Sequence, residues 1–302
     1  MIGYEYEQKR RPAILQDIWD FQQSIPVRLA RFELRLPRGW EYKTHWLNHA
    51  AVEPRSASDS RWIWELENLP AIEREPGMPH WQGVAGWLGV TYFGRDTNSG
   101  QQKQSTWRDI GLWYAQLAAD RCKSTAAIRQ KVVELTAAVA KPVDRIGALA
   151  AFIQKEIRYV AIDVGIGGYQ PHSAEDVYTN RYGDCKDKVT LLRTMLAEIG
   201  VDSYYVLINS NRGVVIPNFS SALGFNHVIL AIRLPVESRR NGLWSVQQDA
   251  QRGTLLYFDP TDTLVPLGML PAARKPPDEL WSVSFRSRRR TAAASIDGCH
   301  AK

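Results

Sequence analysis

Only three cysteines, Cys122, Cys185 and Cys299, occur in the 302 residues of this chain. They are too few and too widely spaced for a framework of disulfide bonds, and no two of them form a C-x-x-C pair. The sequence therefore gives no support to a disulfide-stapled domain, a zinc site or a thioredoxin-like motif. At least one thiol stays free unless it pairs with another chain, so a free thiol is the first candidate for chemistry.

Long apolar runs are also missing. No stretch approaches the roughly 18–20 apolar residues that span a bilayer. The start of the chain, MIGYEYEQKRRPAIL, has early charges but not the apolar segment of a secretory signal. We therefore expect neither a transmembrane segment nor a signal peptide here. The hydrophobic share of 44% and the charged share of 23% are typical of a folded globular protein.

The net positive charge is small outside the end of the chain. The net charge is +6, and seven basic and three acidic residues after residue 265 account for +4 of it. A nucleic-acid-binding face concentrates basic side chains on a folded surface, whereas this excess lies in a tail. We therefore do not expect nucleic acid as a partner.

Residues 1–95 have the pattern of a β-rich domain. Apolar and polar side chains alternate over strand-length runs at 27–34 and 61–68, and turn signals separate these runs. Trp62 and Trp64 fall on one face of the second run by the two-residue period. We expect these tryptophans to pack between two sheets; the alternative is an aromatic platform for carbohydrate or peptide.

The pattern changes to helical spacing at about residue 105, and strands follow at 203–209, 225–234 and 254–261. Helices that come first and a sheet that follows are typical of an α+β arrangement. We therefore expect an α+β fold, with a second domain over 105–270. The tail over 271–302 is basic and irregular, without a sustained apolar period.

Cys185 begins a helix in the segment GDCKDKVTLLRTMLAEIG. Asp184 is a good N-cap residue, and Gly200 is in the position that ends a helix. Counting from the cysteine in steps of four and three gives one apolar face, made of Val189, Leu192, Leu196 and Ile199. Free backbone N–H groups and the positive end of the helix dipole surround a thiol in the first turn, and they favour its thiolate form. A buried cysteine that only fills space is the competing interpretation.

Two strands carry possible partners for this thiol. A nucleophilic cysteine needs an adjacent base, and the base needs a third group that fixes its ring. His227 lies near the start of the apolar strand FNHVILAIRL, and Asp259 ends the strand LLYFDPT. A single histidine in an apolar strand is more often a core residue, so the interpretation depends on all three residues meeting.

The segments RYGDCKDKVTLLRTMLAEIGVDSYYVLI, FNHVI and LLYFDPTD occur in the order of the transglutaminase-like superfamily, relatives of the papain-like proteases. The resemblance covers about 107–266. It implies that Cys185 is the nucleophile, His227 the base and Asp259 the residue that orients the base. Residues 1–95 resemble the latter part of a β-sandwich domain of unknown function in a bacterial subgroup, without its first strands. Better-characterised members have a small residue after the cysteine, whereas Lys186 follows here, as in that subgroup.

The resemblance implies cysteine-dependent acyl transfer on amides of a protein or peptide substrate, without a metal or another cofactor. The alternative is a binding or scaffold protein that retains the fold without turnover. Gln170 and Tyr182 are candidate side-chain donors to the oxyanion, because they are near the cysteine in sequence. We favour hydrolysis over cross-linking, since Lys186 and Lys188 beside the thiol would repel a protonated amine. The resemblance also makes a cell-envelope location plausible if the natural protein begins further upstream.

Overall fold

The computed structural model divides the chain into two compact units, and each is described here by itself. The first unit is Met1–Ser105 together with Asn218–Leu223, and the second is Thr106–Pro217 together with Gly224–Lys302. The structure describes residues 2–9, 14–94, 106–210, 216, 219–235 and 242–271. The expected basic tail therefore lies outside the described residues apart from Pro271.

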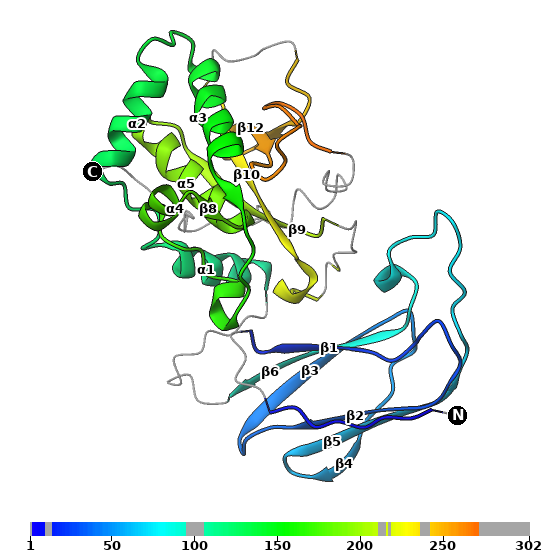
Figure 1. The fold of residues 1–302 in the computed structure, drawn as a ribbon. Coiled ribbons are helices and arrows are strands. Elements are labelled where there is room, and N and C mark those ends of the chain that lie inside the picture. The colour runs from blue at the N-terminus through cyan, green and yellow to red at the C-terminus, as the bar shows by residue number, and fades with distance from the viewer. Residues whose placement is uncertain are drawn as a thin grey trace. The chain divides into compact units, whose positions relative to one another are not determined.

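Two antiparallel three-stranded sheets make up the first unit (Figure 1). One sheet has the order β1-β6-β3, with β1 at Gln16–Asp20, β6 at Trp87–Gly94 and β3 at Trp40–Leu47. The other has the order β2-β5-β4, with β2 at Val27–Arg35, β5 at Arg61–Leu69 and β4 at Arg55–Ser58. A short 3₁₀ helix, η1, lies at Trp81–Gly83.

Side chains of both sheets share one apolar core, so the unit is a β-sandwich. Trp64 is completely buried in this core and packs at 5.7 Å between ring centroids against Phe32 and at 5.5 Å against Tyr42. The alternation of Trp62 and Trp64 with polar residues therefore reflects packing between sheets. Trp62 packs partly against the same core.

The segment Asn218–Leu223 belongs to the first unit, although in sequence it lies between two strands of the second unit. Phe219 is buried there, stacked 5.6 Å from the ring of His45 and 5.7 Å from that of Trp87. Gly89 is required beneath it, because a Cβ at this position would lie 2.5 Å from the Phe219 ring. Gln16 also donates a 2.6 Å hydrogen bond from Nε2 to the carbonyl of Ser220.

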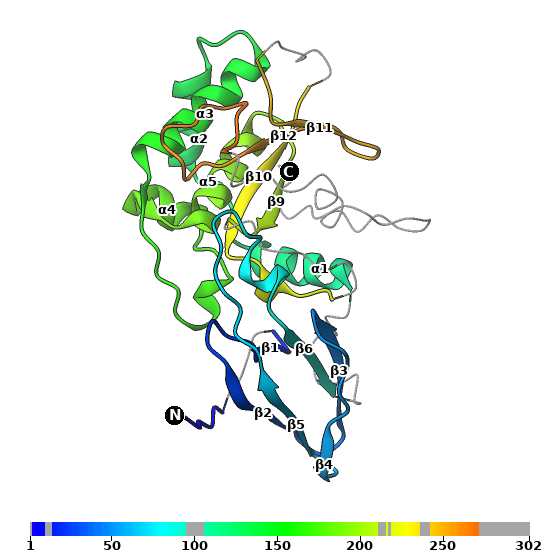
Figure 2. The ribbon, with the colours of Figure 1, turned by 90° about the vertical axis from the view of Figure 1, so that its right-hand side faces the viewer.

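The second unit consists of five helices and a sheet among its described residues. The helices are α1 (Trp107–Ala118), α2 (Ala126–Thr136), α3 (Pro142–Glu156), α4 (Ala174–Asn180) and α5 (Cys185–Glu198). The sheet is antiparallel, with the order β11-β12-β10-β9. Its strands are β9 (Ser203–Ile208), β10 (His227–Arg233), β11 (Val246–Asp249) and β12 (Gly253–Phe258). Figure 2 shows this sheet in yellow and orange beside the green helices.

Four further short elements precede α5 or β10 in the chain. Strands β7 (Arg158–Tyr159) and β8 (Tyr182–Gly183) pair in parallel, and the 3₁₀ helices are η2 (Gly165–Gly168) and η3 (Ala222–Gly224). None of the helices that the structure describes has the length and apolarity to cross a membrane. The mixed arrangement confirms the α+β class expected from the sequence.

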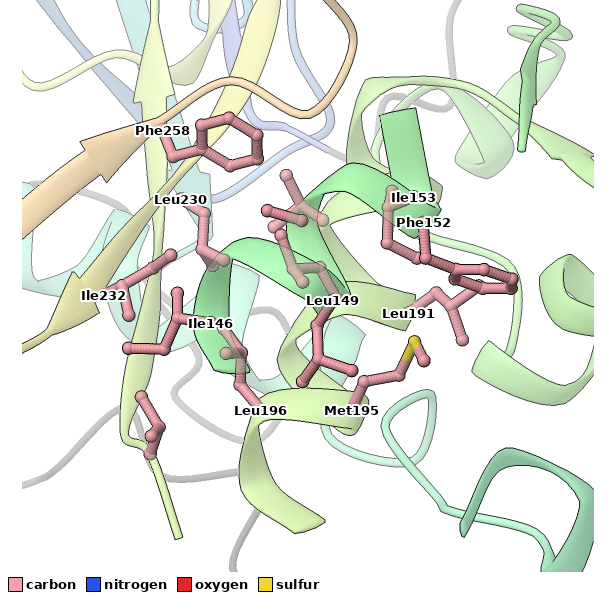
Figure 3. Close-up of a cluster of buried hydrophobic side chains, with 14 of the residues drawn as sticks. Ile146, Leu149, Phe152, Ile153, Leu191, Met195, Leu196, Leu230, Ile232 and Phe258 are labelled. Carbon is pink, nitrogen blue, oxygen red and sulfur yellow. The ribbon is translucent and has the colours of Figure 1, made fainter. Parts of the chain in front are cut away.

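Helix α5 is the centre of the second unit. It packs against α2, α3, α4, β9 and β10. Figure 3 shows its side chains Leu191, Met195 and Leu196 among those of α3, β10 and β12. The alternation along β10 places Leu230 and Ile232 on this side of the sheet, and Ile229 in a second apolar cluster on the other.

The single apolar face expected for α5 describes only part of its environment. Every residue from Lys186 to Leu196 is buried, including the polar ones. The apolar face is therefore only part of the buried surface of the helix, because other helices and strands pack around it. Gly200 does follow the helix end, with a φ of 70° that favours glycine.

Candidate active site

The backbone before Cys185 is fixed by a capping box. Asp184 accepts from the backbone N–H of Asp187, and the Asp187 side chain accepts from that of Asp184 at 3.1 Å. Gly183 makes this turn possible, because a Cβ there would lie 2.6 Å from the Cβ of Asp187. The cap places Cys185 at the first position of α5, partly exposed. Cys185 is the free cysteine among the described residues.

The two lysines that follow the cysteine are buried and have partners. Lys186 forms an ion pair with Asp184 and a second one with Asp163 at 3.5 Å. Burial lowers the pKa of Lys186, but the hydrogen bond to Asp184 and the surrounding carboxylates outweigh it, so its pKa is raised. Its ammonium is therefore a permanent charge inside the site.

Lys188 has a different environment. Its ammonium donates a 2.8 Å hydrogen bond to the carbonyl of Ile157, just before β7. Burial lowers the pKa of Lys188 to about 8, although the negative charge of Asp259 opposes this shift. Lys188 is thus a buried base close to the site, and its side chain does not face solvent.

An imidazole–carboxylate pair, His172 with Asp187, lies at the N-terminal end of α5. Asp187 accepts a 2.7 Å hydrogen bond from the backbone N–H of His172, and its other oxygen lies 3.0 Å from His172 Nδ1. Asp187 is buried, whereas the His172 side chain is mostly exposed. This pair ties the loop before α4 to the first turn of α5.

His227 and Asp259 meet on neighbouring strands. His227 begins β10 and Asp259 directly follows β12, and these two strands pair antiparallel. His227 Nε2 lies 2.7 Å from Asp259 Oδ2. The second carboxylate oxygen accepts from the backbone N–H and the hydroxyl of Thr261, at 2.8 and 2.6 Å. Both side chains of the pair are buried.

The electrostatics connect this pair to Cys185. Burial lowers the pKa of His227, but hydrogen bonds to Asp259 and Cys185 and the charges of both outweigh it and raise the pKa to about 9. Burial raises the pKa of Asp259, but the bonds to His227 and Thr261 outweigh it, and the net shift is downward. Since Asp259 occupies Nε2, the other ring nitrogen remains for the thiol. The arrangement can hold an imidazolium beside the sulfur at neutral pH.

The two oxyanion candidates differ in their positions. Gln170 donates from Nε2 to the carbonyl of Leu117 at 3.1 Å, so its amide is already used to attach its loop to α1. Tyr182 is exposed on β8. The positions of these residues in the sequence gave no indication of these differences.

Tyr159 is a residue that the sequence did not single out. It lies on β7, opposite Gly183 in the parallel pair, and is partly exposed. Burial raises the pKa of Tyr159 to about 12, and the negative charges of Cys185 and Asp184 add to the shift. Its phenol is therefore a neutral hydrogen-bond donor near the thiol. Only the pairing of β7 with the residues before Cys185 brings it there, and no sequence motif indicates that pairing.

Among the described residues, no group of three or more histidine, cysteine, aspartate or glutamate side chains is arranged to hold a metal ion.

Comparison with known families identifies both parts of the chain. Residues 1–73 match a family described as a domain of unknown function, DUF3857, and residues 129–222 match the core of the transglutaminase-like superfamily. The chain therefore has a transglutaminase-like core domain preceded by a DUF3857 domain. No curated protein sequence matches the chain.

One solved structure is similar to this chain at the level of the fold. A "putative protease" from Parabacteroides distasonis is 16% identical with a TM-score of 0.55, over 74% of this chain and 42% of that one. This chain thus spans less than half the length of that protein. A "putative cysteine protease" from Cytophaga hutchinsonii is 12% identical with a TM-score of 0.34, over 82% of this chain and 74% of that one. The periplasmic domain of TgpA from Pseudomonas aeruginosa, bound to ethylmercury, is 13% identical with a TM-score of 0.30, over 81% of this chain and 76% of that one.

Proposed function

We propose that the chain is a cysteine-dependent acyl-transfer enzyme that acts on amides of a protein or peptide through a thioester on Cys185. The observation that carries this proposal is the buried pair of His227 and Asp259, with 2.7 Å between Nε2 and Oδ2, whose imidazole interacts electrostatically with the partly exposed Cys185 at the N-terminus of a capped helix. A partly exposed thiol also favours turnover over a sealed scaffold that only retains the fold.

In the first step the Cys185 thiolate attacks the amide carbonyl and a C–S bond forms. The backbone N–H of Cys185 stabilises the oxyanion. We favour Tyr159 as the side-chain donor, because it lies opposite Gly183 and the charge of Cys185 acts on its phenol, whereas the amide of Gln170 is bonded to Leu117. The imidazolium of His227 then gives its proton to the nitrogen as the C–N bond breaks, and the amine leaves.

In the second step the thioester is resolved. His227, now neutral, removes a proton from water as the water attacks the carbonyl, and Cys185 leaves as thiolate with the acid as product. Asp259 orients the ring and stabilises the imidazolium in both steps. An amine in place of water would give a cross-link instead.

We favour hydrolysis of the thioester over cross-linking, but one argument for it from the sequence fails. The expected repulsion of an amine by Lys186 and Lys188 does not apply, since both ammonium groups are buried and bonded within the protein. Aromatic side chains commonly line amine-acceptor channels, but Trp244, an aromatic residue of this unit, is largely exposed. Cross-linking requires a dry channel that orients the amine, and hydrolysis needs no such channel.

The test combines a nucleophile assay with a product assay. Iodoacetamide should alkylate Cys185 faster at pH 6 than it alkylates N-acetylcysteine, because the His227 imidazolium stabilises the thiolate. Mass spectrometry identifies the modified residue. A glutamine-containing peptide pool with a labelled primary amine then reports acid formation and amine incorporation together, and Cys185→Ala should lose both.

Asp259→Asn is the matched variant that keeps the thiol. It should lower turnover by about 10³–10⁴-fold, as loss of the orienting carboxylate does in related triads. It should also bring the pKa of His227 down from about 9. In the wild type, turnover should fall as the pH rises through about 9, because His227 loses the proton that the leaving amine needs. A thiol no more reactive than N-acetylcysteine, with unchanged turnover in Asp259→Asn, would end the proposal.

A further inference from the structure

Large apolar side chains are exposed in the segment that precedes the candidate nucleophile in sequence. They occupy β7, the loop that follows it, and β8. These side chains, here called the apolar rim, are Tyr159, Ile162, Val164, Ile166 and Tyr182. Val164 is the most exposed, at 78%. Single apolar residues on a surface need no explanation, but apolar residues that are gathered on a surface beside a reactive group are a candidate binding site.

The rim is held in place by its own backbone. The amides of Gly167 and Tyr169 donate to the carbonyls of Val164 and Ile166, at 3.0 and 2.9 Å. Gly165 has a φ of 59°, which allows the tight 3₁₀ turn of η2. The exposed side chains are therefore displayed by a hydrogen-bonded segment.

Three attachments join this segment to the rest of its unit. At its start, the amide of Val160 donates to the carbonyl of Gly183 at 3.0 Å, two residues before Cys185. In its middle, Asp163 pairs with Lys186, the residue after Cys185. At its end, Gln170 donates to Leu117 on α1. The first two of these attachments are thus to residues within two positions of the thiol.

Lys186 therefore has a structural explanation. Its buried ammonium lies between the N-cap Asp184 and the loop residue Asp163. A glycine at this position would leave Asp163 without this partner. The lysine after the cysteine, which departs from the better-characterised relatives, connects the nucleophile to the apolar rim.

We propose that the apolar rim is a substrate subsite, and that the substrates are peptide segments with large apolar side chains next to the scissile amide. This inference rests on the proposed function, because the position of Cys185 decides what covers the rim. A peptide whose carbonyl reaches the sulfur lies beside Gly183 and Lys186, the residues to which this segment is attached. Leucine- or phenylalanine-rich segments cover such a surface, and charged segments would leave it in contact with water.

The experiment measures binding separately from turnover. A Cys185→Ser variant is titrated by calorimetry with two acetylated and amidated hexapeptides that share a central Ala–Ala amide. One has leucine and phenylalanine on both sides, and the other has serine and glutamate. The apolar peptide should bind at least about tenfold tighter, since small changes of apolar contact in a pocket already give about tenfold discrimination.

Val164→Asp, introduced into Cys185→Ser, should remove most of this preference. Val133→Asp is the control: Val133 is an exposed valine on α2, away from the rim in sequence, and should leave the preference unchanged. Ile162→Asp is a second rim variant if the first fails to fold, which circular dichroism reports. Equal affinity for the two peptides, or a preference that Val164→Asp and Ile162→Asp leave intact, would overturn the inference.

Iodoacetamide labelling of the wild type separates the two proposals. An activated Cys185 without a peptide preference refutes the subsite and leaves the enzyme. A preference that depends on Val164 in a protein whose Cys185 is inert supports the rim as a peptide-binding surface and refutes the enzyme.

Discussion

The core of the sandwich and the surroundings of helix α5 exclude water to a similar degree, but different side chains fill them. The sandwich core is apolar and largely aromatic, with Trp64 completely buried at its centre. Helix α5 instead buries Lys186, Asp187, Lys188 and Arg193 together with its apolar face. Buried charges need partners, because taking them out of water is costly.

The partners explain what the polar residues of α5 do. Lys186 and Asp187 bond to Asp184 and thereby fix the turn that positions the thiol, and Arg193 lies 4.4 Å from the ring centroid of Tyr205. The apolar core of the sandwich contributes to stability through burial alone. The polar groups around α5 also orient a reactive side chain, and the comparison can be tested at three positions.

The largest expected effect is in the sandwich. Trp64→Ala should lower the free energy of unfolding by about 3–5 kcal/mol, because the cavity cannot be refilled in a core of interlocked rings. Trp244→Ala is the matched control, and because Trp244 is largely exposed it should change stability by about 0.5 kcal/mol or less. Urea denaturation followed by circular dichroism measures both. Similar effects at the two positions would show that Trp64 is not a core residue.

The second effect depends on pH. The pKa of Lys188 is lowered to about 8 in the folded state, so between pH 8 and about 10.5 the unfolded chain binds more protons. Stability therefore rises with pH in this window, by up to about 3 kcal/mol from this group. Lys188→Met should lack this rise, and Lys131→Met on α2 should retain it. Urea titrations at several pH values measure the difference. Parallel curves for wild type and Lys188→Met would mean that the lysine keeps its ordinary pKa.

The smallest effect compares two capping boxes. Asp109 on α1 and Asp187 on α5 make the same two bonds to their caps, but only Asp187 is buried and also holds His172. Asp109→Ala should cost about 1 kcal/mol. Asp187→Ala should cost about 2–3 kcal/mol, because it leaves buried N–H groups without acceptors. Equal losses in urea denaturation would show that burial adds nothing to the α5 cap.

The sequence predicted the parts of the site that depend on local rules. An aspartate before the cysteine and glycine at 200 indicated the ends of α5, since capping depends on neighbours in the chain. The strand ends at His227 and Asp259 followed from apolar runs. The α+β class and the transglutaminase-like domain are confirmed.

What could not be predicted depends on contacts between distant segments. Lys186 and Lys188 have the spacing of a solvated helix face, and only the elements around α5 show that they are buried. Tyr159 comes near the thiol through a two-residue parallel pair too short to leave a sequence pattern. Gln170 is close to Cys185 in sequence, but it bonds to α1.

The Phe219 segment has a consequence for synthesis of the chain. Chains emerge from the ribosome N-terminus first, and domains generally fold as they appear. The strands of the sandwich end at Gly94, yet the ring that packs on Gly89 arrives only with residue 219. The first unit to emerge is thus completed late, after α1 to α5 and β9 have been made. Until residue 219 has been synthesised, the surface beside His45 and Trp87 that Phe219 covers stays exposed to water.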